Sequence, residues 1–203
     1  MFQMDLTKKP EGVTLRFIEC GIPGCFTIRF PAHADSRGMF VKTIHGPTLT
    51  ARGLNARFVE AFYTISQENV LRGMHLQMPP ADHAKLVYCL AGAVTDVAVD
   101  LRMGSPAFGK FETVELSAED PKGLYLPAGV AHGFYVHQGP AVMMYHTTSA
   151  HEPSLDSGIR WDSFGANWPT TTPVTSARDS ALPALQDFCT PFEFESLPDG
   201  GVE

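Results

Sequence analysis

Short stretches of β-forming residues, separated by glycine, proline and polar turns, recur along almost the whole chain. The 16 prolines and 18 glycines fall largely between these stretches and interrupt any long helical pattern. Strands at such short spacing are typical of a sandwich or jelly roll and not of a parallel sheet with alternating helices. We therefore expect an all-β fold, with strands at Val13–Phe17, Cys25–Phe30, Phe58–Ser66, His83–Leu90, Ala93–Leu101, Lys110–Leu116, Gly123–Leu126, Gly133–Val136 and Ala141–Thr147.

Two finer features of this pattern give testable expectations. The stretch His83–Leu90 continues directly into Ala93–Leu101, which predicts a hairpin with Gly92 in its turn. Only two stretches have helical character. Pro47–Leu54 tolerates its proline in the first turn, and Ser180–Phe188 lies near the C-terminus. We expect both to form short peripheral helices.

Length and composition indicate one globular domain. A chain of 203 residues, 44% hydrophobic and 18% charged, is long enough to bury a sizeable core. We expect residues 1–30 to give N-terminal strands, residues 31–150 the barrel, and residues 151–203 a C-terminal extension with a short helix. No apolar run is long enough to cross a bilayer, and the N-terminus lacks the apolar core of a signal peptide. The expected compartment is the cytoplasm, with no membrane partner.

The charge balance narrows the class of ligand. A formal net charge of −7 argues against a general nucleic-acid binder, because such proteins neutralise phosphates with clustered Lys and Arg. A small phosphorylated ligand needs only two or three local cations and stays compatible with this charge. The four cysteines show no CxxC spacing, so we expect free thiols.

Two glycine-containing segments each place one histidine within the β-rich region. They are Leu71–Gln77 (LRGMHLQ) and Pro127–Phe134 (PAGVAHGF). The pair resembles the two half-motifs of a cupin barrel, a double-stranded β-helix or jelly roll. A metal-binding cupin supplies a His-x-His pair, a glutamate and a third histidine. Here Gln77 stands where the second histidine of the pair would be.

The surviving donors make a poor metal site. One imidazole remains from each half-motif, His75 and His132, whereas Zn, Fe or Mn sites take three or four N or O ligands. The nearby carboxylate is Asp82, and Lys85 would repel a cation. We therefore expect neither metal nor cofactor. A metal held by His75, His132 and either Asp82 or His83 is the alternative.

A longer set of matches, in order across roughly residues 28–185, identifies a family. The chain resembles the dTDP-4-dehydrorhamnose 3,5-epimerases, which use a cupin-like jelly roll without metal. The matching stretches are Asp35–Phe40, Val70–Gln77 with Pro79-Pro80, Lys85–Val87, Asp96–Arg102, Gly104–Gly109, Leu116-Ser117, Pro127–Phe134, Tyr145–Thr148, Ile159–Asp162, Trp168-Pro169 and Ser176–Asp179.

The resemblance implies a cofactor-independent isomerase. The family inverts carbons beside the C4 ketone of a nucleotide-linked 6-deoxyhexose, which requires a base, an enolate-stabilising donor and an acid. In this sequence His75 matches the base and Asp179 the carboxylate that orients it. Lys85 matches the donor, and Tyr145 matches the acid that returns a proton from the opposite face.

Each of these residues also has a purely structural interpretation. Lys85 is compatible with an edge-strand lysine that blocks aggregation. Tyr145 is compatible with packing in a β core. Asp179 is compatible with capping a helix that begins near Ser180. For His75, which follows Arg72-Gly73, the base interpretation is favoured.

The resemblance also implies contacts to substrate. Arg72 matches a diphosphate ligand, and Arg37 matches a residue that reaches across a dimer interface; a surface ion pair with Asp35 or Glu68 is the alternative for both arginines. The chain is accordingly expected to form a homodimer. The full set of expected substrate-binding residues is Arg37, Phe40, Arg72, Gln77, His132 and His151.

Three departures from the family pattern concern the nucleotide. Lys42 stands where the family has glutamate. The family's Phe-Val-Gln-x-Asn is replaced by Phe58–Phe62, with Glu60 in place of glutamine. His151 occupies the position of an aromatic that stacks on thymine. These changes leave the proton-transfer residues intact but put recognition of thymidine in question.

Four alternatives to double epimerisation follow from the same residues. A 3-epimerase that spares C5 would carry the same site. A 3,4-ketoisomerase would be expected to have a paired His-x-His, which His75-Leu76-Gln77 lacks. The others are a metal-dependent cupin isomerase or oxygenase and a non-catalytic sugar-binding barrel.

Overall fold

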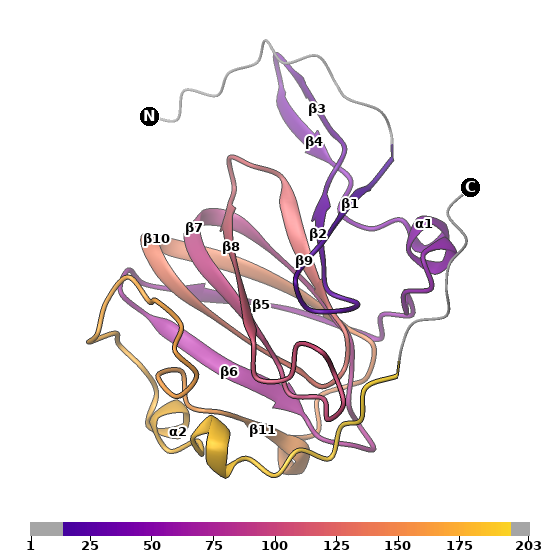
Figure 1. Cartoon of the computed structure of the whole chain (residues 1–203). Helices are drawn as coiled ribbons and strands as arrows, with labels where there is room; N and C mark the ends of the chain where they lie inside the picture. The colour runs from indigo at the N-terminus through magenta and orange to yellow at the C-terminus, as the bar shows by residue number, and fades with distance from the viewer. Residues whose placement is uncertain (1–13, 196–203) are drawn as a thin grey trace.

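The computed structural model describes residues 14–195, and β-strands dominate it (Figure 1). The all-β jelly roll with short peripheral helices expected from the sequence is confirmed. The strands are β1 Arg16–Glu19, β2 Phe26–Arg29, β3 Ala32–Asp35, β4 Gly38–Val41, β5 Glu60–Ser66, β6 Leu71–Gln77, β7 Lys85–Asp100, β8 Phe111–Ser117, β9 Lys122–Leu126, β10 Val130–Thr147 and β11 Asp156–Gly158. The helices are α1 Gly46–Ala51 and α2 Ala177–Ser180, with 3-10 turns at Pro153–Leu155 and Leu185–Asp187.

Two long strands, β7 and β10, build the barrel. They pair antiparallel with each other along most of their length, with register shifts between Val136 and Met143. The first part of β7 pairs with β9, and its second part pairs with β8. The first part of β10 pairs with β6, and its second part pairs with β5. A single nine-stranded sheet thus folds over itself, with an apolar core between its halves.

The predicted hairpin at Gly92 is wrong. The stretches on either side of it form the one continuous strand β7. Gly92 has a φ of +75°, but the close approach of β10 also requires it there. A Cβ at this position would lie 2.4 Å from the Gln138 carbonyl oxygen and 2.9 Å from Ala141 Cα. The predicted strands Gly133–Val136 and Ala141–Thr147 likewise belong to a single strand, β10.

The first and last described segments pack on different parts of the folded sheet. Strands β1 and β2 extend one half beside β9, where Phe26, Ile28, Leu86 and Tyr125 form a cluster with Leu49 of α1. The C-terminal extension covers the other half, with Ile159 and Phe192 packed on Met74, Val97 and Leu101. This second contact brings α2 against β6, the strand that carries His75.

The short helices only partly match their predictions. Helix α1 overlaps the predicted Pro47–Leu54 but begins at Gly46 and ends at Ala51, with its proline in the first turn. The predicted helix Ser180–Phe188 is wrong, because α2 ends at Ser180 and only a 3-10 turn, Leu185–Asp187, follows. Pro183 lies between them and has no N–H to continue a helix. Val13, the first residue of the first predicted strand, lies outside the described residues, and the single-domain organisation over residues 1–203 stays a prediction.

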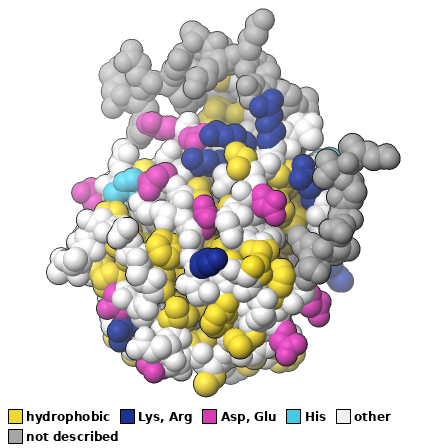
Figure 2. All heavy atoms as spheres, in the orientation of Figure 1, with side chains coloured by type: hydrophobic (Ala, Val, Ile, Leu, Met, Phe, Trp, Pro, Cys, Tyr) yellow, Lys and Arg dark blue, Asp and Glu magenta, His cyan; other side chains and the backbone are white. Residues whose placement is uncertain are grey.

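Strands β3 and β4 form a separate two-stranded hairpin that projects from the barrel (Figure 1). Lys and Arg side chains gather toward this end of the face drawn in Figure 2. Within residues 14–195, no helix is both long and apolar enough to cross a membrane.

Candidate active site

A cavity of about 330 Å³ lies within the folded sheet. Strands β5, β6, β7 and β10 supply most of its wall, and segments from the C-terminal extension complete it. Eight of the ten residues expected from the sequence to form the site lie here or contact a residue that does. Its lining comprises Glu60, Phe62, Thr64, Arg72, His75, Leu76, Gln77, His83, Lys85, His132, Phe134, Tyr145, Thr147, His151, Asp156 and Arg178.

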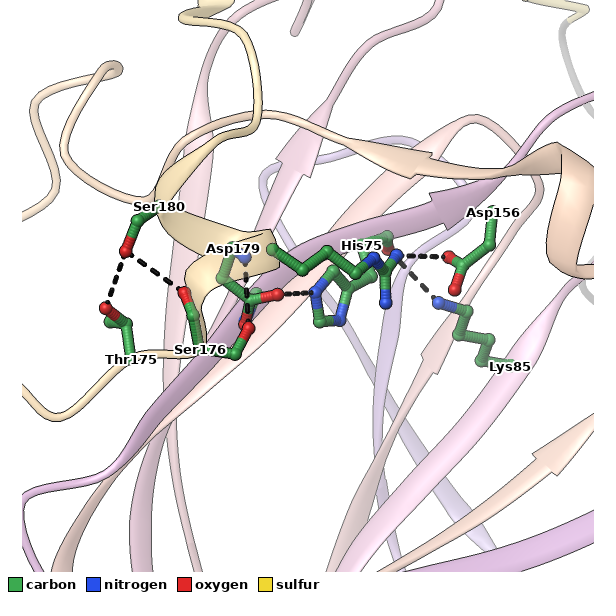
Figure 3. A network of polar contacts seen from close by, with 9 residues as sticks. His75, Lys85, Asp156, Thr175, Ser176, Asp179 and Ser180 are labelled. Atoms are coloured by element: carbon green, nitrogen blue, oxygen red, sulfur yellow. Dashed lines mark hydrogen bonds and ion pairs between the residues drawn. The ribbon is translucent and has the colours of Figure 1, made fainter.

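His75 and Asp179 form a hydrogen-bonded pair at this cavity. Nε2 of His75 lies 2.8 Å from Oδ1 of Asp179 (Figure 3). The Gly73 N–H donates to the other carboxylate oxygen at 3.2 Å. Burial alone would raise the pKa of Asp179, but the hydrogen bonds from His75 and Gly73 outweigh it and lower the pKa. Asp179 is therefore ionised at neutral pH and fixes the imidazole with Nε2 as donor.

Ser176, not Asp179, caps α2. The Ser176 hydroxyl accepts the Asp179 N–H at 3.0 Å, whereas the Asp179 side chain turns toward β6 (Figure 3). The capping interpretation of Asp179 is therefore wrong. The cap orients this one-turn helix so that the Asp179 carboxylate contacts His75, which lies far earlier in the chain.

Lys85 begins β7 and lines the cavity. Its ammonium group donates to the His75 carbonyl oxygen at 3.1 Å. Burial lowers the pKa of Lys85 to about 8, although the carboxylates of Asp156 and Asp96 partly oppose this effect. The edge-strand interpretation of Lys85 is wrong, because β7 lies between β9 and β10 inside the sheet.

Tyr145 lies on β10, with only 7% of its surface exposed, and belongs both to the core and to the cavity wall. Burial raises its pKa well above the usual value, and the nearby Asp96 carboxylate adds to this effect. The phenol therefore stays protonated at neutral pH. The Phe62 ring stacks on it, with ring centroids 4.8 Å apart.

A second histidine–aspartate pair lies deeper. Nε2 of His132 is 2.8 Å from Oδ2 of Asp96, and the two side chains are 4% and 0% exposed. His132 is directly opposite His75 in the β6–β10 register, so the two half-motif histidines are neighbours. Burial raises the pKa of Asp96, while its partner His132 opposes the rise.

Besides His132, three expected substrate-binding residues line the cavity, and they differ in how many hydrogen bonds hold their side chains. Nε of Arg72 donates to the Ser66 hydroxyl at 2.9 Å, leaving the rest of the guanidinium toward the cavity. Gln77 is 3% exposed, and its amide contacts Ala81, Ser149 and Ala150 while its carbonyl accepts the Glu152 N–H. Gln77 therefore ties two loops together. His151 is exposed at the cavity, and its N–H donates to Glu60.

Arg37 and Phe40 do not reach this cavity. Both lie on the β3–β4 hairpin, and their exposures are 88% for the Arg37 side chain and 61% for Phe40. Arg37 pairs with Asp35 at 2.6 Å, which is the surface ion pair considered as an alternative.

Sequence reasoning missed an ion pair at the site. Arg178 Nη2 lies 2.8 Å from Asp156 Oδ1, and both residues line the cavity. Arg178 lies in the matched Ser176–Asp179 stretch, so its position next to Asp179 in the sequence could have marked it as a site residue. The sequence offered no comparable signal for Asp156.

The residues of the alternative metal site are not arranged as a ligand set. Within residues 14–195, no three His, Cys, Asp or Glu side chains are grouped to hold a metal ion. His75 and His132 each use Nε2 for an aspartate. Burial, together with Lys85 and His151, lowers the pKa of His83 to about 3.

Comparison with known proteins decides the family. The model of the dTDP-4-dehydrorhamnose 3,5-epimerase family matches residues 19–187. The chain belongs to this family. A relative from Sinorhizobium fredii, a dTDP-4-dehydrorhamnose 3,5-epimerase, is 37% identical over 171 residues, which are 82% of this chain and 88% of the relative. A dTDP-4-dehydrorhamnose 3-epimerase from Streptomyces niveus is 34% identical and covers 81% of each chain.

A solved relative shares the whole fold. The dTDP-6-deoxy-D-glucose-3,5-epimerase of Legionella pneumophila, determined in complex with dTDP-4-keto-L-rhamnose, superposes with a TM-score of 0.85 at 32% identity. The match covers 90% of this chain and 100% of that one. The family resemblance found in the sequence, and with it the isomerase class, is confirmed.

Proposed function

We propose that this protein epimerises a nucleotide-linked 4-keto-6-deoxyhexose in deoxysugar biosynthesis, without a cofactor. The observation that carries the proposal is the His75–Asp179 pair, which shares one cavity with Lys85 and Tyr145. These side chains can remove a proton from carbon, stabilise the resulting enolate and return a proton. The relatives named above, which act on dTDP-linked 4-keto sugars, support the same chemistry.

His75 is the proposed base. Because Nε2 donates to Asp179, the lone pair of the neutral imidazole is on Nδ1, and Nδ1 makes no hydrogen bond within residues 14–195. Nδ1 takes the proton from the carbon beside the ketone. The Asp179 carboxylate then stabilises the imidazolium, since a hydrogen bond to a charged group is worth about 1.5–3 kcal/mol.

Lys85 and Tyr145 complete the reaction. The Lys85 ammonium donates to the C4 oxygen of the substrate as that oxygen gains negative charge. Its hydrogen bond to the His75 carbonyl oxygen keeps the ammonium near the base. Tyr145 is protonated at neutral pH and returns the proton from the opposite face of the sugar ring. His75 and Tyr145 would then exchange protonation states once per inversion.

The remaining site residues bind the substrate in this proposal. Arg72 and Arg178 offer guanidinium groups to the diphosphate, since their planar forks match phosphate oxygens. His132, held by Asp96, supports the cavity floor. Gln77 shapes the wall and His151 borders the nucleotide.

A homodimer would give Arg37 and Phe40 a role. They lie on the projecting hairpin, away from the cavity of their own subunit, and so act in this proposal at the site of the second copy. Tyr63 and Ile65, on the outer face of β5, are 63% and 57% exposed and offer an apolar surface for such a contact. The cytoplasmic location expected from the sequence stays a prediction.

Proton NMR in D₂O tests the proposed function. Incubation with a nucleotide-linked 4-keto-6-deoxyglucose should exchange the protons at C3 and C5 for deuterium and give the inverted product. Exchange at C3 alone would indicate a 3-epimerase, the activity named for the Streptomyces niveus relative. His75→Ala should abolish exchange, whereas His137→Ala, outside the cavity lining, should not. Exchange that persists in His75→Ala would remove His75 as the base.

A further inference from the structure

One corner of the cavity carries a carboxylate that the proton-transfer chemistry does not use. Glu60, Phe62 and Thr64 alternate along β5, and all three line the cavity. Oε2 of Glu60 accepts the His151 N–H at 2.6 Å. Oε1 makes no hydrogen bond with any other residue in 14–195. The backbone of His151 thus fixes the carboxylate and leaves an oxygen with unused acceptor capacity.

The diphosphate of the substrate does not fit this corner. Phosphate oxygens carry negative charge and take cationic partners, so they would be repelled by Glu60. The cationic side chains of the cavity are Arg72 on β6, Lys85 on β7 and Arg178 on α2, and none of them is on β5. Lys85 donates to the C4 oxygen in the proposed reaction, which leaves the two arginines for the diphosphate. The diphosphate therefore lies with these two arginines.

The nucleobase is the part of the substrate that suits the corner. The hexose must lie among the proton-transfer residues, and the diphosphate lies with the arginines. Phe62 and His151 line the cavity together with Glu60, and planar heterocycles pack well on flat rings such as theirs. Glu60 then faces the polar edge of a base.

Resting on the function proposed above, we propose that Glu60 selects a substrate whose base carries an exocyclic amino group, with guanine the best fit, over one carrying thymine. A carboxylate is an acceptor only. Guanine presents two adjacent donors, N1–H and the N2 amino group, which match the two oxygens of a carboxylate. Thymine presents one N–H between two carbonyl oxygens, and those oxygens would face the negative charge of Glu60.

The sequence departure at this position agrees with the geometry. Glutamine, the residue that the family pattern has at position 60, offers both a donor and an acceptor to a base. Glu60 removes the donor. His151 and Phe62, which line the cavity with Glu60, are departures from the family pattern as well.

The test compares GDP-, CDP- and dTDP-linked 4-keto-6-deoxyglucose as substrates of the full chain, with kcat/KM for deuterium exchange as the readout. For the unaltered protein we expect the guanine or cytosine compound to exceed the thymine compound by about 10- to 100-fold, the discrimination of a well-placed contact to a base edge. Glu60→Gln keeps an acceptor for the His151 N–H and restores a donor, so it should reduce this ratio at least tenfold. Glu119→Gln, an exposed residue outside the cavity, should leave the ratio unchanged.

Two results would overturn the assignment while leaving the epimerase function intact. One is a preference of the unaltered protein for the dTDP compound. The other is an equal loss for all three compounds in Glu60→Gln, which would place Glu60 at a sugar hydroxyl instead of a base. Absence of exchange with every compound would instead contradict the proposed function itself.

Discussion

The lowered pKa of Lys85 makes the pH dependence of the reaction predictable. The ammonium form stabilises the enolate, and this form is lost as the pH rises through about 8. Above that point kcat should fall about tenfold per pH unit, because only the protonated fraction is competent. Lys85→Arg carries a guanidinium that stays charged throughout this range, so its profile should lack the descending limb at about 8, even if its maximum is lower.

The same burial of Lys85 also makes the stability of the fold depend on pH. Between pH 8 and 10.5 the unfolded chain holds a proton at Lys85 that the folded chain does not, so stability rises with pH across this window. Below pH 8 the full cost is present, and a shift from 10.5 to about 8 corresponds to at most roughly 3 kcal/mol.

Lys85→Met should therefore be inactive but more stable than the unaltered protein at pH 7, with a gain that shrinks toward pH 10.5. Urea unfolding at pH 7 and pH 10 measures this difference, and Lys110→Met, an exposed residue, is the control. A Lys85→Met protein that is less stable at pH 7, or a Lys85→Arg profile that keeps the limb at 8, would refute the burial argument.

The other predictions concern the acid, the orienting carboxylate and a strand contact. Tyr145→Phe should slow product formation more than deuterium exchange, since protons could leave but not return on the new face; equal losses by NMR would count against that role. Asp179→Asn should lower kcat about 10- to 100-fold with little change in KM, through loss of a charge-assisted hydrogen bond in steady-state assays; an unchanged kcat would make the carboxylate merely structural. Gly158→Ala would place a Cβ 1.8 Å from the Met74 carbonyl oxygen and should lower the free energy of unfolding in urea by at least about 2 kcal/mol. Gly46→Ala, where a Cβ meets open space, is the control and should not destabilise the fold. Equal stability of the two variants would show that β11 moves freely.

The sequence allowed the residue types of the candidate site to be predicted better than their arrangement in space. The segments around His75 and Tyr145 could be recognised because each lies in a compact stretch that matches the family pattern. Gly92 could not be assigned correctly, because a glycine required by a neighbouring strand and a glycine in a turn look alike in one dimension. Asp179 was ambiguous for a similar reason, since a helix start offers a carboxylate both a cap and a tertiary partner.

Residues brought in by pairing were the hardest to foresee. Phe62 belongs to the site because β5 pairs with β10 in a register that places it opposite Tyr145. Asp156 belongs because the short strand β11 joins the edge of β6. Neither register follows from local pattern. For Arg37 and Phe40 the expected role depends on a second copy, which one chain does not contain.

The sharing of β7 and β10 between both halves of the sheet limits how the molecule can admit its substrate. Each of these strands carries groups for the cavity at widely spaced points, Lys85 and Asp96 on one, His132 and Tyr145 on the other. The two halves of the sheet therefore cannot move apart as rigid bodies, because separating them would break strands β7 and β10. Any widening of the entrance therefore falls to the connecting segments at the rim, such as the loops that Gln77 ties together. Turnover in this enzyme should thus be sensitive to loop substitutions that leave the barrel untouched.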